Sequence, residues 1–112
     1  MSTIMRERKP AAPRLATCLT VALSEGATHY VVDTVNVSDR GLCLLPKKVF
    51  PVGTRLHLVF GRPPELPCLS TDGIVRWSEG GKGVGVEFTT ISPHDHRALL
   101  RFVTSQSYRE QA

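Results

Sequence analysis

The segment that decides the fold is residues 28–41, with the sequence THYVVDTVNVSDRG. Its first ten residues, 28–37, are rich in Tyr, Val and Thr, which β-strands favour. The next four, Ser-Asp-Arg-Gly at 38–41, are turn formers, and a further apolar run begins at Leu42. This segment therefore predicts two consecutive β-strands joined by a tight polar turn.

Short runs of β-forming residues recur on both sides of this segment at regular spacing. The predicted strands are residues 15–23, 28–37, 42–45, 54–60, 68–77 and 84–88. The connections are expected at 24–26, 38–41, 46–53, 61–67 and 79–83, and the three prolines in 61–67 indicate a long connection. Six short strands with such spacing favour a closed or nearly closed barrel of antiparallel strands.

One helix is expected after the last strand. Ser92 is a good N-cap, Pro93 suits the first helical position, and Asp95 can serve as the acid of a capping box. The apolar stripe of this helix is expected to consist of Leu99, Leu100 and Val103, with Phe102 beside it. The helix should end near Ser107. The predicted fold class is therefore all-β, a six-stranded antiparallel β-barrel with one C-terminal α-helix.

Length and composition indicate one globular domain. The chain has 112 residues, of which 41% are hydrophobic and 21% charged, and it contains no run of 18 apolar residues. We expect a flexible basic N-terminal arm at 1–13, the barrel domain with its helix at 14–107, and a tail at 108–112. No apolar stretch follows the early basic residues, so we expect a cytoplasmic protein that does not enter a membrane. At this length we also expect no output domain in the chain itself.

The charge balance predicts an anionic partner. The formal net charge is +4 and the sequence pI is about 9.3, which fits a phosphate ligand, a nucleic acid or an acidic protein.

The three cysteines, Cys18, Cys43 and Cys68, are spaced too widely for a CxxC pair or a zinc site. We expect them to be reduced, buried, small hydrophobic residues, and we expect no metal and no cofactor.

The polar turn after the second strand carries the candidate binding residues. The amide of Asn36 both donates and accepts, which matches the mixed edge of a guanine base. Ser38 can donate to a phosphate or hold the turn, and Gly41 allows either a positive φ or close approach of a planar ligand. The same residue types also form ordinary Asx and ST turns.

A basic residue is expected beside this turn. Arg14 directly precedes the first strand and Asn36 ends the second. Because the start of one strand lies beside the end of the next in an antiparallel hairpin, the two side chains should meet at one end of the barrel. The planar fork of an arginine pairs with phosphate and its face stacks on a purine. This convergence predicts a nucleotide site.

The chain resembles PilZ domains, the bacterial receptor modules for cyclic di-GMP. The resemblance rests on an arginine-bearing arm, the turn at 36–41 with its N-x-S-x-x-G pattern, and two later motifs, 73–77 (GIVRW) and 83–88 (GVGVEF). It covers about residues 8 to 105. It implies a six-stranded barrel that binds cyclic di-GMP, often as a stacked pair of molecules. It also implies that Arg14, Asn36, Ser38 and Gly41 are ligand-binding residues.

The arm departs from the family pattern, in which two arginines stand four residues apart. If Arg14 is the second of them, the first position falls on Pro10, which has neither charge nor donor. The nearest substitutes are Lys9 and Arg8. An arm at roughly 3.3 Å per residue could still bring Arg8 back over a ligand. We therefore add Arg8 and Lys9 to the candidate ligand-binding residues.

The expected function is that of a stand-alone cyclic di-GMP receptor, a monomer or weak dimer that orders its basic arm over the ligand and signals through a protein partner. The alternatives are a degenerate adaptor of the same fold that binds only proteins, and a basic barrel that binds nucleic acid. The nucleic-acid alternative is disfavoured by an aromatic content of 6%, which is too low for a surface on which bases stack.

No constellation of residues supports an enzyme. His94, Asp95 and His96 are expected to form an exposed helix start, because positions i and i+2 of a helix point in different directions. His29 and His57 are expected at the surface of strands. Trp77 is expected in the core or in packing at the rim.

Overall fold

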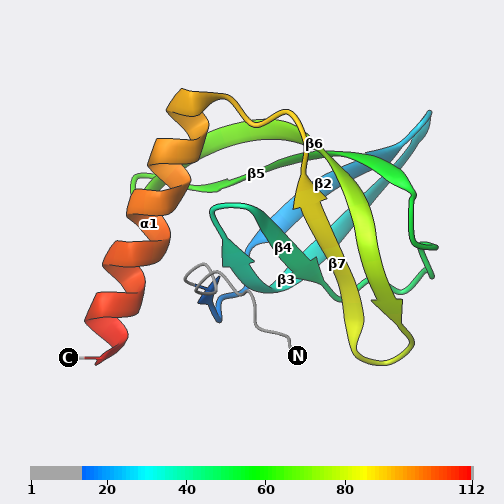
Figure 1. Ribbon diagram of the computed structural model, residues 1–112, viewed down its shortest axis with the longest axis horizontal. Helices are drawn as coiled ribbons and strands as arrows, with labels where there is room; N and C mark the ends of the chain where they lie inside the picture. Colours follow the sequence, from blue (N-terminus) through cyan, green and yellow to red (C-terminus); the bar gives the residue numbers. More distant parts are fainter. Residues whose placement is uncertain (1–13, 112) are drawn as a thin grey trace, which may run out of the picture.

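The computed structural model describes residues 14–111, with side chains up to residue 106. The arm predicted at 1–13, with the candidate ligand residues Arg8 and Lys9, lies outside the described residues, as does Ala112. The elements are β1 (Arg14–Leu15), β2 (Thr20–Glu25), β3 (Thr28–Ser38), β4 (Gly41–Leu44), β5 (Arg55–Arg62), β6 (Leu66–Glu79), β7 (Gly83–Phe88) and α1 (Pro93–Gln111) (Figure 1).

The strands form a closed barrel. They are hydrogen-bonded in the order β3, β2, β5, β6, β7, β4, and the pairing of β4 with β3 closes the ring. Every pairing is antiparallel, and the two-residue β1 is an extra strand that pairs with the end of β3. The expected all-β class, a six-stranded antiparallel barrel with one C-terminal helix, is confirmed.

The first predicted strand, 15–23, is in fact two strands, β1 and β2, separated by an irregular segment. Buried Thr34 on β3 explains the interruption. Its hydroxyl donates to the carbonyl oxygen of Thr17 at 2.6 Å and accepts from the backbone N–H of Leu19 at 2.8 Å. Because this side chain satisfies backbone groups that a ladder would otherwise pair, the chain leaves the sheet here without losing hydrogen bonds.

Two further boundaries differ from expectation. The connection predicted at 61–67 is only the turn 63–65, since ladder pairing resumes between Arg62 and Leu66. Pro63 and Pro64 fit because they occupy the turn itself, where no ladder N–H is required, and Pro67 is the exposed second residue of β6. The helix continues to Gln111, past its expected end, so most of the predicted tail at 108–112 is helical.

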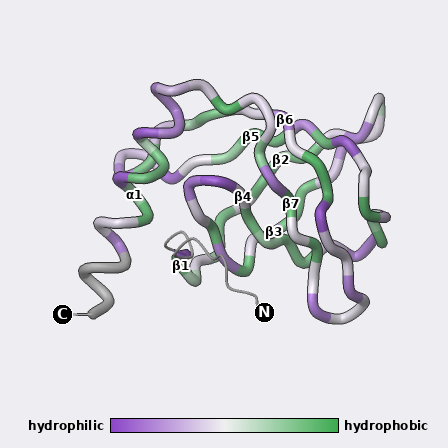
Figure 2. Tube along the Cα trace, viewed as in Figure 1, coloured by the Kyte–Doolittle hydropathy of each residue, from purple (hydrophilic) through white to green (hydrophobic). Residues whose placement is uncertain are grey.

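The core is built from the inward-facing residues of the strands and one face of the helix (Figure 2). Val21 and Leu23 on β2, for example, are buried while their neighbours are not, which is the period of a strand with one face inward. On α1 the buried residues are Leu99, Phe102 and Val103, whereas Leu100 is 37% exposed. The expected stripe was therefore wrong at Leu100, because positions i, i+3 and i+4 share a helix face and i+1 does not.

The helix begins where the sequence predicts and packs beside the barrel. The backbone N–H of Asp95 donates to Ser92 Oγ at 3.1 Å, which confirms the N-cap. The helix packs against β1, β3 and β6, and it lies on the side opposite the projecting β2–β3 hairpin (Figure 1). Among the described residues, no helix has the length and apolar character needed to cross a bilayer.

The cysteines do not share one environment. Cys43 is buried, as expected, but Cys18 and Cys68 are exposed, so that expectation was wrong for two of the three. Cys18 lies in the irregular segment between β1 and β2, and Cys68 lies at an outward position of β6. Burial raises the pKa of the Cys43 thiol, although nearby Arg14 acts in the opposite direction.

We predict that thiol reagents will distinguish these cysteines. At pH 8, native protein should react rapidly at Cys18 and Cys68, while Cys43 should react only after denaturation, because it is buried and its raised pKa disfavours the reactive thiolate. Mass spectrometry after timed alkylation measures this. Equal labelling rates at all three positions in folded protein would contradict the buried placement of Cys43.

Candidate functional site

The polar turn between β3 and β4 is held together by Ser38. This side chain is fully buried. Its hydroxyl donates to the carbonyl oxygen of Gly41 and accepts from the backbone N–H of Arg40, both at 3.2 Å. Of the two roles considered for Ser38, the structure shows the one that stabilises the turn. The hydroxyl thereby fixes the direction in which the neighbouring side chains leave the turn.

Arg14 and Asn36 lie at the same end of the barrel. Arg14 pairs with Ser38 in the β1–β3 ladder. Its Nε donates to Asn36 Oδ1 at 2.8 Å, and its Nη1 lies 3.5 Å from Ser38 Oγ. The predicted juxtaposition is therefore confirmed. Within the described residues the Asn36 amide group keeps its donors free, because only its oxygen is engaged.

Gly41 is required for a reason that the sequence did not reveal. Its φ is not among the positive values, which occur at Gly26, Gly53, Gly81 and Gly83. A Cβ at Gly41 would instead collide with the carbonyl oxygen of Val86 on β7. Glycine at this position therefore allows the backbones of β4 and β7 to approach closely, rather than supplying a left-handed conformation.

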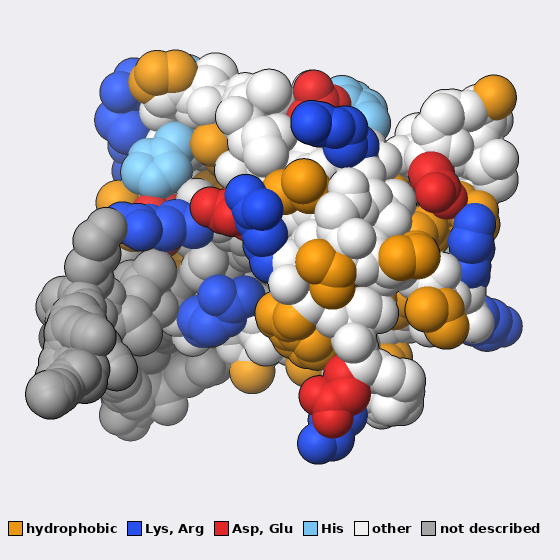
Figure 3. Space-filling model, turned by 45° about the vertical axis from the view of Figure 1, so that its right-hand side comes forward, with side chains coloured by type: hydrophobic (Ala, Val, Ile, Leu, Met, Phe, Trp, Pro, Cys, Tyr) orange, Lys and Arg blue, Asp and Glu red, His pale blue; other side chains and the backbone are white. Residues whose placement is uncertain are grey.

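A small cavity adjoins the turn. Its volume is about 190 Å³. Its lining includes Arg14, Ser38, Arg40, Gly41, Arg76, Trp77 and Glu87. The three arginines come from β1, the turn and β6. Figure 3 shows one face of the molecule, on which Lys and Arg side chains gather left of centre.

The electrostatics of this cavity favour an anion. Arg76 Nε donates to Glu87 at 2.6 Å, so this acid offsets one arginine. Arg14 and Arg40 form no ion pair with any residue in the range 14–106. Two cationic side chains that have no acidic partner within that range, directed at one small concavity, provide an attractive potential for phosphate.

Trp77 forms an aromatic wall of the cavity. It is 43% exposed and pairs with Gly85 in the β6–β7 ladder. A Cβ at Gly85 would overlap the indole ring, so this glycine leaves room for the ring to lie against β7. Rim packing, one of the two environments expected for Trp77, is confirmed. The sequence contains a signal for this contact, because the spacing between the motifs at 73–77 and 83–88 places Trp77 opposite Gly85.

Asp39 and His96 connect the turn to the helix. The carboxylate of Asp39 accepts from His96 Nε2 at 2.8 Å, and the side chain of Asp39 is 10% exposed. Its other oxygen, Oδ1, is buried and has no partner among the described residues. The expectation that 94–96 is only an exposed helix start was therefore wrong at His96. The contact joins residues 57 apart in sequence, so no local pattern could reveal it.

We predict that His96→Ala will lower the free energy of unfolding by about 1–3 kcal/mol, because it leaves a buried carboxylate oxygen without its donor. Urea denaturation followed by circular dichroism measures the change. His94→Ala is the matched control, since His94 is exposed on the same helix turn. A loss of stability in the His94 variant as large as that in the His96 variant would contradict the assigned role.

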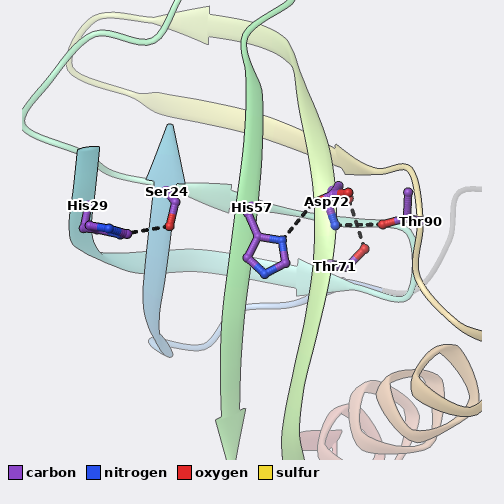
Figure 4. A network of polar contacts seen from close by, with 6 residues as sticks. All are labelled: Ser24, His29, His57, Thr71, Asp72 and Thr90. Atoms are coloured by element: carbon purple, nitrogen blue, oxygen red, sulfur yellow. Dashed lines mark hydrogen bonds and ion pairs between the residues drawn. The ribbon is translucent and has the colours of Figure 1, made fainter. Parts of the chain in front are cut away.

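A second group of polar side chains lies across the outer face of the barrel (Figure 4). Ser24 Oγ lies 3.1 Å from His29 Nδ1, and His57 Nδ1 lies 2.8 Å from Asp72 Oδ1. The row contains the residue types of a hydrolase triad, but the serine contacts His29 rather than the histidine that binds the aspartate. The expectation of surface histidines in strands is confirmed.

This row does not form a metal site or an ion pair of consequence. No three potential metal ligands cluster among the described residues. The His57 and Asp72 side chains are 49% and 56% exposed, and an ion pair so accessible to water contributes little to stability. The cavity beside Arg14 is therefore the better candidate for a functional site.

Comparisons with known proteins agree with the fold. A family model described as PilZ domain matches residues 8–105. The chain is similar in structure to the inhibitor of motility MotI/DgrA of Bacillus subtilis, with a TM-score of 0.81 at 19% identity, covering 96% of this chain and 56% of that one. This chain thus spans little more than half the length of that protein. No curated protein matches the chain.

Two isolated domains are also similar. The PilZ domain of YcgR from Escherichia coli, solved with c-di-GMP, has a TM-score of 0.67 at 15% identity, covering 96% of this chain and 97% of that one. The PilZ domain of CeSA from a cellulose-synthesizing bacterium has a TM-score of 0.61 at 15% identity, covering 84% of this chain and 97% of that one. Similarity at such low identity establishes the shared architecture.

Proposed function

The chain belongs to the PilZ domain family, and from this premise we propose that it is a receptor for cyclic di-GMP that acts by binding rather than by catalysis. The observation that carries the proposal is the 2.8 Å contact between Arg14 and Asn36 at the rim of a cavity lined by two arginines that have no acidic partner among the described residues. The similar PilZ domain of YcgR, which was solved with c-di-GMP, supports the choice of ligand.

Each part of the site suits one part of the ligand. The guanidinium groups of Arg14 and Arg40 provide planar, paired donors for a phosphate. The free amide donors of Asn36 can bind the acceptor edge of a guanine. The half-exposed ring of Trp77 gives a purine a surface on which to stack, a contact worth roughly 1–3 kcal/mol per base. Ser38 and Gly41 contribute by fixing the turn that carries these groups.

The site would be open on its outer side. Its volume of about 190 Å³ is smaller than the roughly 300–1,000 Å³ of pockets that enclose small molecules. We propose that the basic segment 1–13, with Arg8 and Lys9, covers the ligand from this side. Ordering that segment costs conformational entropy, which charge-assisted contacts to phosphate offset. The covered surface would then be read by a protein partner.

Isothermal titration calorimetry tests this proposal directly. Purified protein should bind cyclic di-GMP with a measurable heat, while GTP at the same concentration should bind far more weakly, because a single guanine cannot engage both the turn and the arm. A folded protein that gives no heat at millimolar cyclic di-GMP would reject the receptor function and favour the adaptor alternative.

We predict that Arg8, rather than Lys9, is the residue of the arm that adds a further cation to the site. Both lie close to the position where the family has its first arginine, but only the guanidinium pairs with phosphate through two parallel donors. Arg8→Ala should therefore weaken cyclic di-GMP binding about tenfold, or roughly 1.4 kcal/mol, and Lys9→Ala by less than about threefold. The same calorimetric titration measures both variants, and the reverse ranking would assign the role to Lys9.

A further inference from the structure

One stretch of β3 has an open edge. β3 pairs with β2 from Thr28 to Asp33, but its pairing with β4 on the other side begins only at Thr34. In the part of the chain that the structure describes, no strand pairs with residues 29–32 on that side. An open edge presents backbone donors and acceptors to any extended segment that approaches it.

Two hydrogen bonds show which backbone groups face this edge. The N–H of Thr34 donates to the carbonyl oxygen of Leu19, toward β2, and the N–H of Leu45 donates to the carbonyl oxygen of Asp33, away from β2. Because alternate residues of a strand direct their N–H and C=O to opposite edges, Val31 also directs both groups away from β2. Within residues 14–111, no hydrogen bond engages them on that side.

A groove runs along this edge. Its volume is about 490 Å³, and it lies between residues 30–33 of β3 and the segment 45–48. Tyr30 and Phe50, also in its lining, pack edge to face at 5.4 Å. Val31 is 76% exposed and Leu45 is 53% exposed. The groove therefore offers apolar contacts beside the free backbone groups.

The charges along the groove favour an acidic occupant. Lys48 is engaged, since its Nζ lies 3.1 Å from Glu25 and 3.0 Å from the Tyr30 hydroxyl, and these hydrogen bonds raise its pKa. Asp33 is directed toward β2, where it accepts from the Thr20 hydroxyl at 3.3 Å. Lys47 is exposed and forms no ion pair within the described residues. Asp33 also has no cationic partner among the described residues, but its carboxylate is directed away from the open edge, so Lys47 is the unpaired charge beside that edge.

We propose that this groove binds an extended segment of a partner protein, which adds to the edge of β3 as a further strand. The segment would exchange hydrogen bonds with Val31, place apolar side chains between Leu45 and Phe50, and set a carboxylate beside Lys47. Backbone pairing supplies affinity in this mode of recognition, and alternate side chains supply specificity. A second copy of the chain suits the groove less well, because it would bring its own segment 45–48 against this wall.

The groove is separate from the nucleotide site. The two cavities share no lining residue, and Ser38 lies seven positions beyond Val31 on β3, or roughly 23 Å along an extended strand. The inference therefore goes beyond the proposed function and can hold whether or not the chain binds cyclic di-GMP.

Nuclear magnetic resonance with a synthetic peptide tests the proposal. The probe is an eight-residue peptide of alternating Val and Glu, added to ¹⁵N-labelled protein without nucleotide, and the control peptide has Lys in place of Glu. The Glu peptide should slow hydrogen exchange at the Val31 amide at least about tenfold and shift resonances of 30–33 and 45–48. The Lys peptide should bind more weakly.

Two variants sharpen the test. Lys47→Glu should weaken binding of the Glu peptide roughly threefold to fivefold and strengthen that of the Lys peptide. Lys82→Glu, on the β6–β7 turn outside the groove, should change neither. Val31→Pro removes the outward N–H, fixes φ and replaces the exposed valine side chain, so it should abolish binding, while an unchanged circular dichroism spectrum confirms the fold.

Three outcomes would overturn the proposal. One is the absence of exchange protection at Val31 with millimolar Glu peptide. Another is binding that Lys47→Glu and Lys82→Glu affect equally. The third is protection of Val31 that rises with protein concentration in the absence of peptide, which would assign the groove to a second copy of the chain.

Discussion

Replacing Arg14 with Ala is expected to weaken binding of cyclic di-GMP by at least about 100-fold. The guanidinium is anchored by its 2.8 Å contact with Asn36 and lines the cavity with its remaining donors. A hydrogen bond to a charged group contributes about 1.5–3 kcal/mol, and the loss of two such bonds to phosphate corresponds to about 100-fold or more. Calorimetric titration at fixed ionic strength measures the effect, because phosphate binding depends on salt.

Three companion variants show whether the loss belongs to this site. Arg14→Lys keeps the charge but not the paired donors, so its affinity should be intermediate. Arg55→Ala removes an exposed arginine that does not line the cavity and should leave the affinity unchanged. Ser38→Ala removes both hydrogen bonds that hold the turn and should also weaken binding strongly. Undiminished affinity in both Arg14→Ala and Ser38→Ala would show that the ligand binds elsewhere.

Gly41→Ala is expected to be among the most destabilising single-methyl substitutions in the chain. The added Cβ would collide with the carbonyl oxygen of Val86, which belongs to the backbone of β7 and cannot rotate away as a side chain could. Relief requires β4 and β7 to separate, although they pair at four positions from Gly41 to Leu44. We expect a loss of about 3 kcal/mol or more in the free energy of unfolding, at the upper end of overpacking effects.

Gly80→Ala is the matched control. A Cβ at Gly80 meets no atom within 4 Å, and its φ is not positive. Its stability in urea should therefore change by less than about 0.5 kcal/mol. If Gly41→Ala proved as stable as Gly80→Ala yet lost cyclic di-GMP affinity, the glycine would be required by the ligand rather than by the sheet.

Local sequence patterns predicted most of the elements because the forces behind them are local. The run of β-forming residues at 28–37 and the following turn gave β3 and its exit, and Ser92 with Pro93 gave the helix start, which the N-cap bond confirms. The meeting of Arg14 and Asn36 could also be predicted, because it needs only the antiparallel pairing of neighbouring segments. Arg40 and Arg76 were missed as site residues because nothing local marks them.

The remaining features depend on barrel closure and helix docking, which bring together residues far apart in sequence. The bond between Asp39 and His96 joins the turn to the helix, and the need for Gly41 arises only where β4 meets β7. The open edge at Val31 exists because β4 is too short to cover all of β3. Alternation and turn chemistry are fixed residue by residue, so the sequence alone determined the strands, the turn and the helix cap. Close contacts between strand backbones and unpaired strand edges follow from how whole strands pair, so only the tertiary structure decided them.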